Sequence, residues 1–142
     1  SHSISVGLAG GENIRGEENF KTMIDGRLFR YIQPDVGKWG GISGCLTVAK
    51  YALSSGLIYC PHWLGSSVGL MASAHLLAAA GGSGQLEVDA NPNPLRDHLF
   101  TGFPTPSNGA LHLSDSPGLG GHPNPDSFER YAQPNLTRFD TP

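Results

Sequence analysis

The sequence predicts an α/β fold: the second half of a (β/α) TIM-like barrel, with four parallel strands and three intervening helices, followed by an irregular C-terminal tail. Short apolar runs alternate with segments of helical periodicity, an order typical of parallel sheets with right-handed crossovers. Polar residues end the four runs at steps of 23, 27 and 25 residues, close to the roughly 30 residues of one barrel unit. An open doubly wound sheet gives the same order and stays the alternative.

Four short segments are predicted as strands. The first alternates apolar with small residues, whereas the third is a continuous apolar run, as in parallel strands that are covered on both faces. A proline follows the second and the third, where neither strand can continue. The predicted strands are residues 4–9, 28–33, 57–60 and 85–89.

Three longer segments between these strands are predicted as helices. In the first, Phe20, Met23 and Ile24 share one face, and Gly26 suits a left-handed C-cap. Ser43 is the expected N-cap of the second helix. The third is rich in Leu and Ala and is closed by glycines. The predicted helices cover about residues 17–25, 43–55 and 66–80.

The pattern changes after residue 95, where prolines and glycines interrupt it. We therefore expect a partial barrel over residues 1–95 and a tail over residues 96–142, which packs on the barrel or on an absent capping domain. Within the tail we expect a short strand at 110–113 and a helical turn at 126–133.

Composition excludes several classes of partner. Nine Lys+Arg stand against twelve Asp+Glu, for a net charge of -3 and no basic stripe to neutralise a phosphate backbone. No apolar run reaches the roughly 20 residues of a membrane span. Cys45 and Cys60 form neither a CxxC pair nor a disulfide framework. We expect a cytoplasmic protein with free thiols that binds neither nucleic acid nor membrane.

A polar residue follows each predicted strand, and these four residues are the candidate site. The carboxyl ends of all strands in a parallel barrel face one mouth, so the four side chains converge there. A single polar residue at a strand end is also explained by a solvated loop. It is the occurrence of four such residues at regular spacing that favours a site. The four are Glu12, Asp35, His62 and Glu87.

Four motifs surround these residues: 10–13, 33–35 with 40–41, 61–62, and 86–89 through 93–95. In these motifs the chain resembles the enolase superfamily, in its mandelate racemase group, over about residues 4–131. The resemblance implies that Glu12 is the third carboxylate ligand of Mg²⁺, that Asp35 and His62 form a hydrogen-bonded pair, and that Glu87 is the acid after the last strand. A related group carries lysine in place of Asp35, so this aspartate favours racemases and dehydratases.

The resemblance further implies a Mg²⁺-dependent enzyme that removes the α-proton of a carboxylate, either a sugar acid or a 2-hydroxy acid, to give an enediolate. His62 serves as the base, Asp35 fixes its tautomer, and Glu87 hydrogen-bonds the substrate carboxylate. We expect an acid-sugar dehydratase. The alternatives are a racemase or epimerase of a 2-hydroxy acid, and a non-catalytic half-barrel that self-associates.

Further ligands of Mg²⁺ belong, in this family, to the first half of the barrel and to a capping domain. A lone Glu12 cannot hold the ion. We therefore expect the isolated chain to be an inactive fragment, in line with its start at Ser1, and to require a complementing chain or homo-oligomer.

Four other residues have two readings each. Lys38 is expected to point into its loop or to pair with an acid, with substrate contact as the alternative. Trp39 and Trp63 either wall the substrate pocket or pack against a neighbouring loop. His75, inside an apolar helix, is expected to be a packed or surface histidine.

Overall fold

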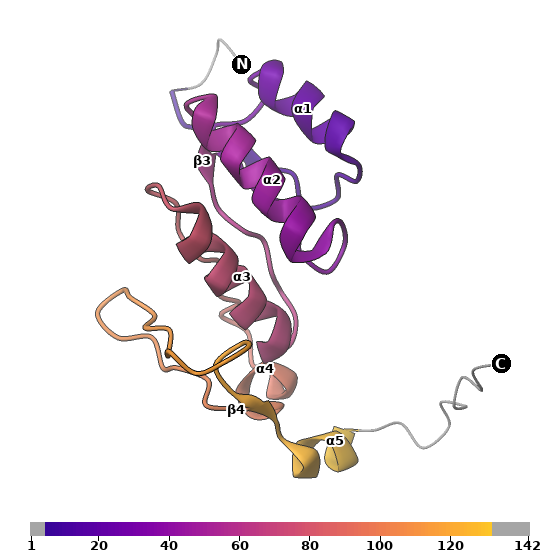
Figure 1. Cartoon of the computed structure of the whole chain (residues 1–142), viewed down its shortest axis with the longest axis vertical. Helices are drawn as coiled ribbons and strands as arrows, with labels where there is room; N and C mark the ends of the chain where they lie inside the picture. The colour runs from indigo at the N-terminus through magenta and orange to yellow at the C-terminus, as the bar shows by residue number, and fades with distance from the viewer. Residues whose placement is uncertain (1–4, 132–142) are drawn as a thin grey trace, which may run out of the picture.

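The computed structural model of the chain describes residues 5–131 (Figure 1). Three short strands alternate with three helices in its first part, and this order confirms the predicted α/β fold. The elements are β1 (Ala9–Gly10), α1 (Glu17–Asp25), β2 (Tyr31–Ile32), α2 (Gly41–Ser54), β3 (Ile58–Tyr59) and α3 (Ser67–Ala80).

The three strands form one parallel sheet in the order β1-β2-β3. Gly10, Ile32 and Tyr59 are in register across it, and residues in register lie on the same face. Ile32 and Tyr59 are fully buried, with Ile32 packed against side chains of α1 and α2. Ala9, in the alternate register, is exposed. The helices therefore cover one face of the sheet and leave the other open.

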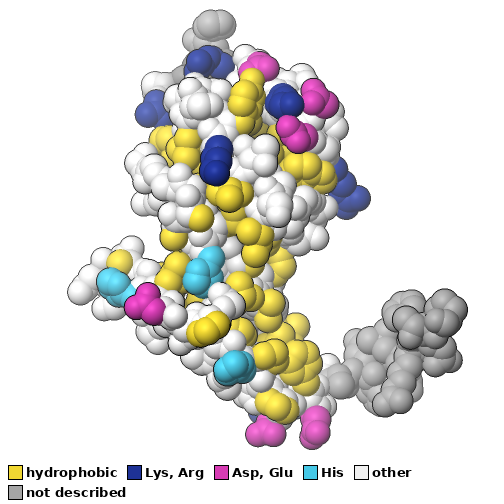
Figure 2. Space-filling view, in the orientation of Figure 1, with side chains coloured by type: hydrophobic (Ala, Val, Ile, Leu, Met, Phe, Trp, Pro, Cys, Tyr) yellow, Lys and Arg dark blue, Asp and Glu magenta, His cyan; other side chains and the backbone are white. Residues whose placement is uncertain are grey.

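The main core lies between this sheet and the first two helices. On α1 the residues of the predicted apolar face, Phe20, Met23 and Ile24, are all buried, and they meet Val48 of α2. Each such side chain contributes about 1.5–3 kcal/mol when it leaves water. Lys21 beside this face pairs with Glu17 and Glu18, and Figure 2 shows basic and acidic side chains close together at the end of the molecule where α1 lies. The sheet and its helices thus form a stable base for the strand ends.

Two predicted helix caps are wrong. Gly26 has a right-handed conformation, and Arg27 next to it takes the positive φ of 49° that ends the turn. α2 begins at Gly41, so Ser43 lies inside its first turn; Gly40, with φ 72°, precedes the helix instead. Glycine reaches this conformation at little steric cost, which lets the chain turn sharply from the end of β2 into α2.

The strands are shorter than predicted, and the fourth predicted strand is not formed. Residues 85–89 carry no strand pairing. The backbone amide of Gln85 donates to Cys60 Sγ at 3.4 Å, where a parallel ladder would require a carbonyl oxygen. Gly84 lies so close to the Tyr59 carbonyl that an added Cβ would overlap with it. Residues 84–85 therefore contact the end of β3 without the regular hydrogen bonds of a parallel strand pair.

The last described part consists of α4 (Pro94–His98), the antiparallel strands β4 (Phe100–Thr101) and β5 (His122–Pro123), and α5 (Pro125–Tyr131). The predicted strand at 110–113 is wrong, because Ala110 instead closes a turn with Ser107 through an isolated bridge. The predicted helical turn is present as α5, and its last residues, 132–133, lie outside the described range. None of the helices within residues 5–131 is long and apolar enough to cross a membrane.

Candidate active site

Three of the four predicted site residues lie together at the carboxyl end of the sheet. Glu12 follows β1, Asp35 follows β2 and His62 follows β3, and an isolated parallel bridge joins the backbones of Asp35 and His62. All three line one pocket of about 540 Å³, together with Lys38 and Trp63. The parallel register alone brings these side chains, far apart in the sequence, to one edge.

The imidazole of His62 is held between the two carboxylates. Its Nδ1 lies 2.9 Å from Asp35 Oδ2, and its Nε2 lies 2.6 Å from Glu12 Oε2. Asp35 and His62 are buried, whereas the Glu12 side chain is 42% exposed. The ring therefore has one nitrogen anchored inside the protein and the other directed to the pocket.

Asp35 is fixed from its other oxygen as well. Its Oδ1 accepts hydrogen bonds from the backbone amides of Gly37 at 2.8 Å and Lys38 at 3.1 Å. A carboxylate that accepts this many bonds keeps its orientation, and its Oδ2 accepts the Nδ1 proton of His62. This arrangement selects the tautomer in which Nε2 carries the lone pair whenever the ring is neutral.

Glu12 approaches the outer nitrogen of the ring. Its Oε2 lies 2.6 Å from Nε2, the atom that carries the lone pair when the ring is neutral and Asp35 accepts the Nδ1 proton. Nε2 is thus the ring atom that can exchange a proton with a group in the pocket, which is the property required of a general base and acid.

Trp63 forms a rigid wall beside His62. Its ring packs against three glycines so closely that a Cβ at Gly37 or Gly65 would come within 2.6 Å of it, and one at Gly69 would overlap with it. The indole N–H also donates to the Ser66 carbonyl at 2.7 Å. Trp63 therefore both lines the pocket and packs against the neighbouring loop at Gly37, so the two interpretations hold together for this tryptophan.

Trp39 belongs instead to the core. Its ring packs on Phe20, with 5.2 Å between ring centroids, and it covers Gly44 of α2. It does not line the pocket that contains His62. Trp39 therefore has a packing role, with α1 and α2 as its partners in place of the expected neighbouring loop.

Glu87 is not brought into this cluster. Its Oε2 accepts a hydrogen bond of 3.3 Å from Gln33 Nε2, and it does not line the pocket. Because residues 85–89 are not paired into the sheet, strand register does not carry Glu87 to the edge where Glu12 and His62 meet.

Asn13 is a site residue that the sequence did not single out for a role. Its Nδ2 donates to Glu12 Oε1 at 2.9 Å, and its Oδ1 accepts from Lys38 Nζ at 3.1 Å. The only signal for it was its position directly after Glu12.

Residues 1–127 match the family described as enolase C-terminal domain-like. The chain belongs to this family. The resemblance to the mandelate racemase group of the enolase superfamily, first seen in the strand-end motifs, is thereby confirmed, and so is the assignment to one half of a (β/α) barrel.

Known members of the enolase superfamily are similar over most of this chain. Arabinonate dehydratase of Saccharolobus solfataricus is 30% identical over 92% of the chain and 35% of its own length. A mandelate racemase/muconate lactonizing enzyme of Bordetella bronchiseptica is 48% identical, with a TM-score of 0.85, over 91% of the chain and 36% of its own. An enolase of Pantoea ananatis, solved with D-gluconate and magnesium, is 28% identical with a TM-score of 0.79 over 91% and 31%. The chain spans about a third of these relatives.

The described residues of this enolase-superfamily chain fit one position in a magnesium shell. Glu12 offers a carboxylate at a pocket, the ligand type that Mg²⁺ prefers. Within residues 5–131, however, no group of three or more His, Cys, Asp or Glu side chains could hold a metal ion. Glu12 can therefore serve as a single ligand, with the rest of the shell supplied by groups outside these residues.

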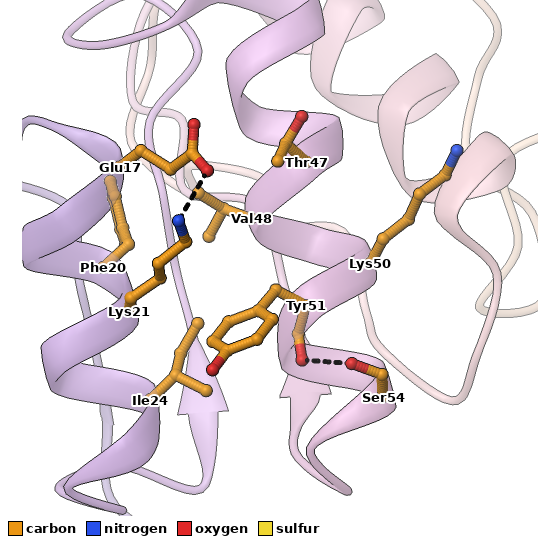
Figure 3. A pocket seen from close by; sticks show the side chains of 9 residues that line it. All are labelled: Glu17, Phe20, Lys21, Ile24, Thr47, Val48, Lys50, Tyr51 and Ser54. Carbon is orange, nitrogen blue, oxygen red and sulfur yellow. Dashed lines mark hydrogen bonds and ion pairs between the residues drawn. The ribbon is translucent and has the colours of Figure 1, made fainter.

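Neither Cys45 nor Cys60 lines the pocket that contains His62. Burial raises the pKa of Cys45 to about 11, so this free thiol is unreactive at neutral pH. A groove of about 390 Å³ lies between α1 and α2 and is lined by both apolar and polar side chains (Figure 3). Its polar contacts are structural, such as the bond from Tyr51 Oη to Asp25 Oδ1 at 2.7 Å. None of the four predicted site residues lines it.

Proposed function

We propose that the protein containing this chain removes the α-proton of a sugar-acid carboxylate and expels the β-hydroxyl as water, as a dehydratase. The observation that carries this proposal is the Asp35–His62 pair, whose outer ring nitrogen, Nε2, faces a pocket beside Glu12. The likeness to arabinonate dehydratase and to a structure with bound D-gluconate favours sugar acids as the substrate class.

His62 is the proposed base. With Asp35 holding Nδ1–H, the neutral ring presents its lone pair at Nε2, where it takes the substrate α-proton, and the electron pair of the C–H bond is left on the substrate. The imidazolium that forms is stabilised by Asp35. The same proton then passes to the departing β-hydroxyl, so that the C–O bond breaks and water leaves. The enol that remains rearranges to a 2-keto-3-deoxy acid.

Glu12 is the proposed metal ligand of this chain. Bound Mg²⁺ supplies electrostatic stabilisation for the negative charge that develops on the substrate carboxylate. Glu12 Oε2 contacts Nε2 at 2.6 Å, and this contact must open before Nε2 can take the substrate proton. Glu87 is proposed to hydrogen-bond the substrate carboxylate, a role that requires it to leave its contact with Gln33.

Racemisation or epimerisation of a 2-hydroxy acid is the second candidate, favoured by the 48% identity to a mandelate racemase/muconate lactonizing enzyme. It shares the first step. The outcomes differ in what happens next, because a second base on the opposite face of the substrate returns a proton to the same carbon and no hydroxyl leaves.

A non-catalytic half-barrel is the third candidate. Val6, before β1, is 73% exposed, Leu8 is 38% exposed, and β1 pairs with β2 alone among the described strands. An open edge and exposed apolar side chains favour association with another chain. Two measurements on this chain alone test it. Light scattering shows whether the chain forms a stable dimer, and incubation with substrate in deuterated water shows whether it exchanges the α-proton. A stable dimer without exchange supports this candidate.

The decisive experiment uses the full-length protein with Mg²⁺ and either D-arabinonate or D-gluconate in deuterated water. We expect the wild type to yield a 2-keto-3-deoxy acid and His62→Asn to abolish both this product and α-proton exchange. His112→Asn, at an exposed histidine in the C-terminal part, is the matched control and should keep both. Exchange retained in His62→Asn would rule out this base, and exchange with inverted stereochemistry but no keto acid would favour racemisation.

A further inference from the structure

Lys38 connects two of the loops that form the site. It follows Asp35 by three residues and lies in the loop between β2 and α2. Its ammonium nitrogen reaches across to the loop after β1, where it donates to Asn13 Oδ1 at 3.1 Å. It also lies 3.7 Å from Glu12 Oε2 and 3.8 Å from Asp35 Oδ2. One cation therefore contacts both loops and both carboxylates.

These two carboxylate oxygens are the same ones that contact His62. Glu12 Oε2 meets Nε2 and Asp35 Oδ2 meets Nδ1, so Lys38 faces the two oxygens that grip the imidazole. Two carboxylates gathered around one ring repel each other, and a cation within 4 Å of both offsets that repulsion. Lys38 thus stabilises the two carboxylates side by side at this edge of the sheet.

The backbone of Lys38 is itself anchored by the site. Its amide donates to Asp35 Oδ1 at 3.1 Å and to the Asp35 carbonyl at 3.2 Å. The start of the side chain is therefore fixed relative to Asp35, although the side chain is 37% exposed. A lysine that merely solvated the loop would not converge on three acceptor groups.

We propose that Lys38 is a positioning residue of this site, whose ammonium group offsets the charges of Glu12 and Asp35 beside His62 and ties the loop after β1 to the loop after β2. Asn13 acts with it, because it binds Lys38 through its oxygen and Glu12 through its nitrogen. The expected effect of Lys38 on catalytic rate rests on the proposed function of His62. Its expected effect on the surroundings of the His62 ring does not.

The test compares Lys38→Met, which keeps the aliphatic stem and removes the charge, with Lys38→Arg, which keeps a cationic donor. The control is Lys50→Met, the same change at an exposed lysine of α2. In the full-length protein, we expect Lys38→Met to lower kcat about 10-fold to 100-fold with little change in KM, since a small misplacement of catalytic groups has this cost. Lys38→Arg should recover most of the loss, and Lys50→Met should show none.

A second measurement separates this proposal from the proposed function. In the full-length protein with ¹⁵N-labelled histidine, at one fixed pH and without added metal, the ring signals of His62 are assigned by their loss in His62→Asn. We expect Lys38→Met to shift both ring nitrogens, and Lys38→Arg and Lys50→Met to leave them near the wild-type positions. Unchanged ring signals in Lys38→Met overturn the positioning role. Absence of α-proton exchange in the wild type overturns the proposed function alone.

Discussion

Asp35 and Glu87 are two acidic side chains near the carboxyl end of β2, and they are held in different ways. Asp35 is buried, accepts two backbone amide bonds and contacts His62. Glu87 is half-buried and has a single hydrogen bond of 3.3 Å, from Gln33. The difference follows from the sheet, because Asp35 continues a paired strand whereas residues 85–89 pair with none. A carboxylate is thus fixed for chemistry where both its backbone and its side chain are hydrogen-bonded.

The largest effect is expected for Asp35→Ala. It removes the partner of a buried imidazole and leaves two amides without an acceptor, which destabilises the protein by about 3–5 kcal/mol. It also frees the His62 tautomer, so activity of the full-length protein should be lost. Thermal unfolding and α-proton exchange measure the two effects. A variant with normal exchange would show that Asp35 does not orient the base.

Gly69→Ala in α3 should have the next largest effect. A Cβ there would overlap with the Trp63 ring, and forcing the ring aside costs about 1–3 kcal/mol. We expect a lower melting temperature, altered tryptophan fluorescence and a higher KM, because the displaced ring enters the pocket. The control is Gly44→Ala in α2, where the new Cβ would lie 3.2 Å from Trp39 and alanine favours the helix. An equal loss of thermal stability in both variants would contradict the requirement for glycine beside the Trp63 ring.

Glu87→Gln should change folding stability by less than about 1 kcal/mol, because its one hydrogen bond is long and partly solvated. If Glu87 acts on the substrate, however, the full-length variant should lose activity with an unchanged melting temperature. This pattern would separate Glu87 from Asp35, which affects both. A Glu87→Gln variant with wild-type kcat and KM would remove Glu87 from the site.

The sequence was sufficient to predict the first three strands and helices in order, and three members of the site, because period and spacing determine which strand ends share an edge. Glu12, Asp35 and His62 come together through the register of β1, β2 and β3. The same reasoning could not predict whether residues 85–89 pair with another strand. An alternation of apolar residues shows that a segment can form a strand, but it does not show that a neighbouring strand is available to pair with it. The sequence also could not show whether Trp63 lines the pocket, because the glycines that pack against its ring come from two different segments.

The smallest effect is expected for Tyr51→Phe, far from the site in the groove between α1 and α2. Tyr51 Oη donates to Asp25 Oδ1 at 2.7 Å, and this bond raises the pKa of the tyrosine above its ordinary value of 10.0. A raised pKa in the folded state means that the stabilisation is fully present below pH 10 and is lost as the pH rises through the folded value. Wild type should therefore melt slightly above Tyr51→Phe at pH 7, and the gap should close in alkaline solution. Melting curves from pH 7 to pH 11 measure this, and a gap that widens with pH would contradict the role of Asp25 as acceptor.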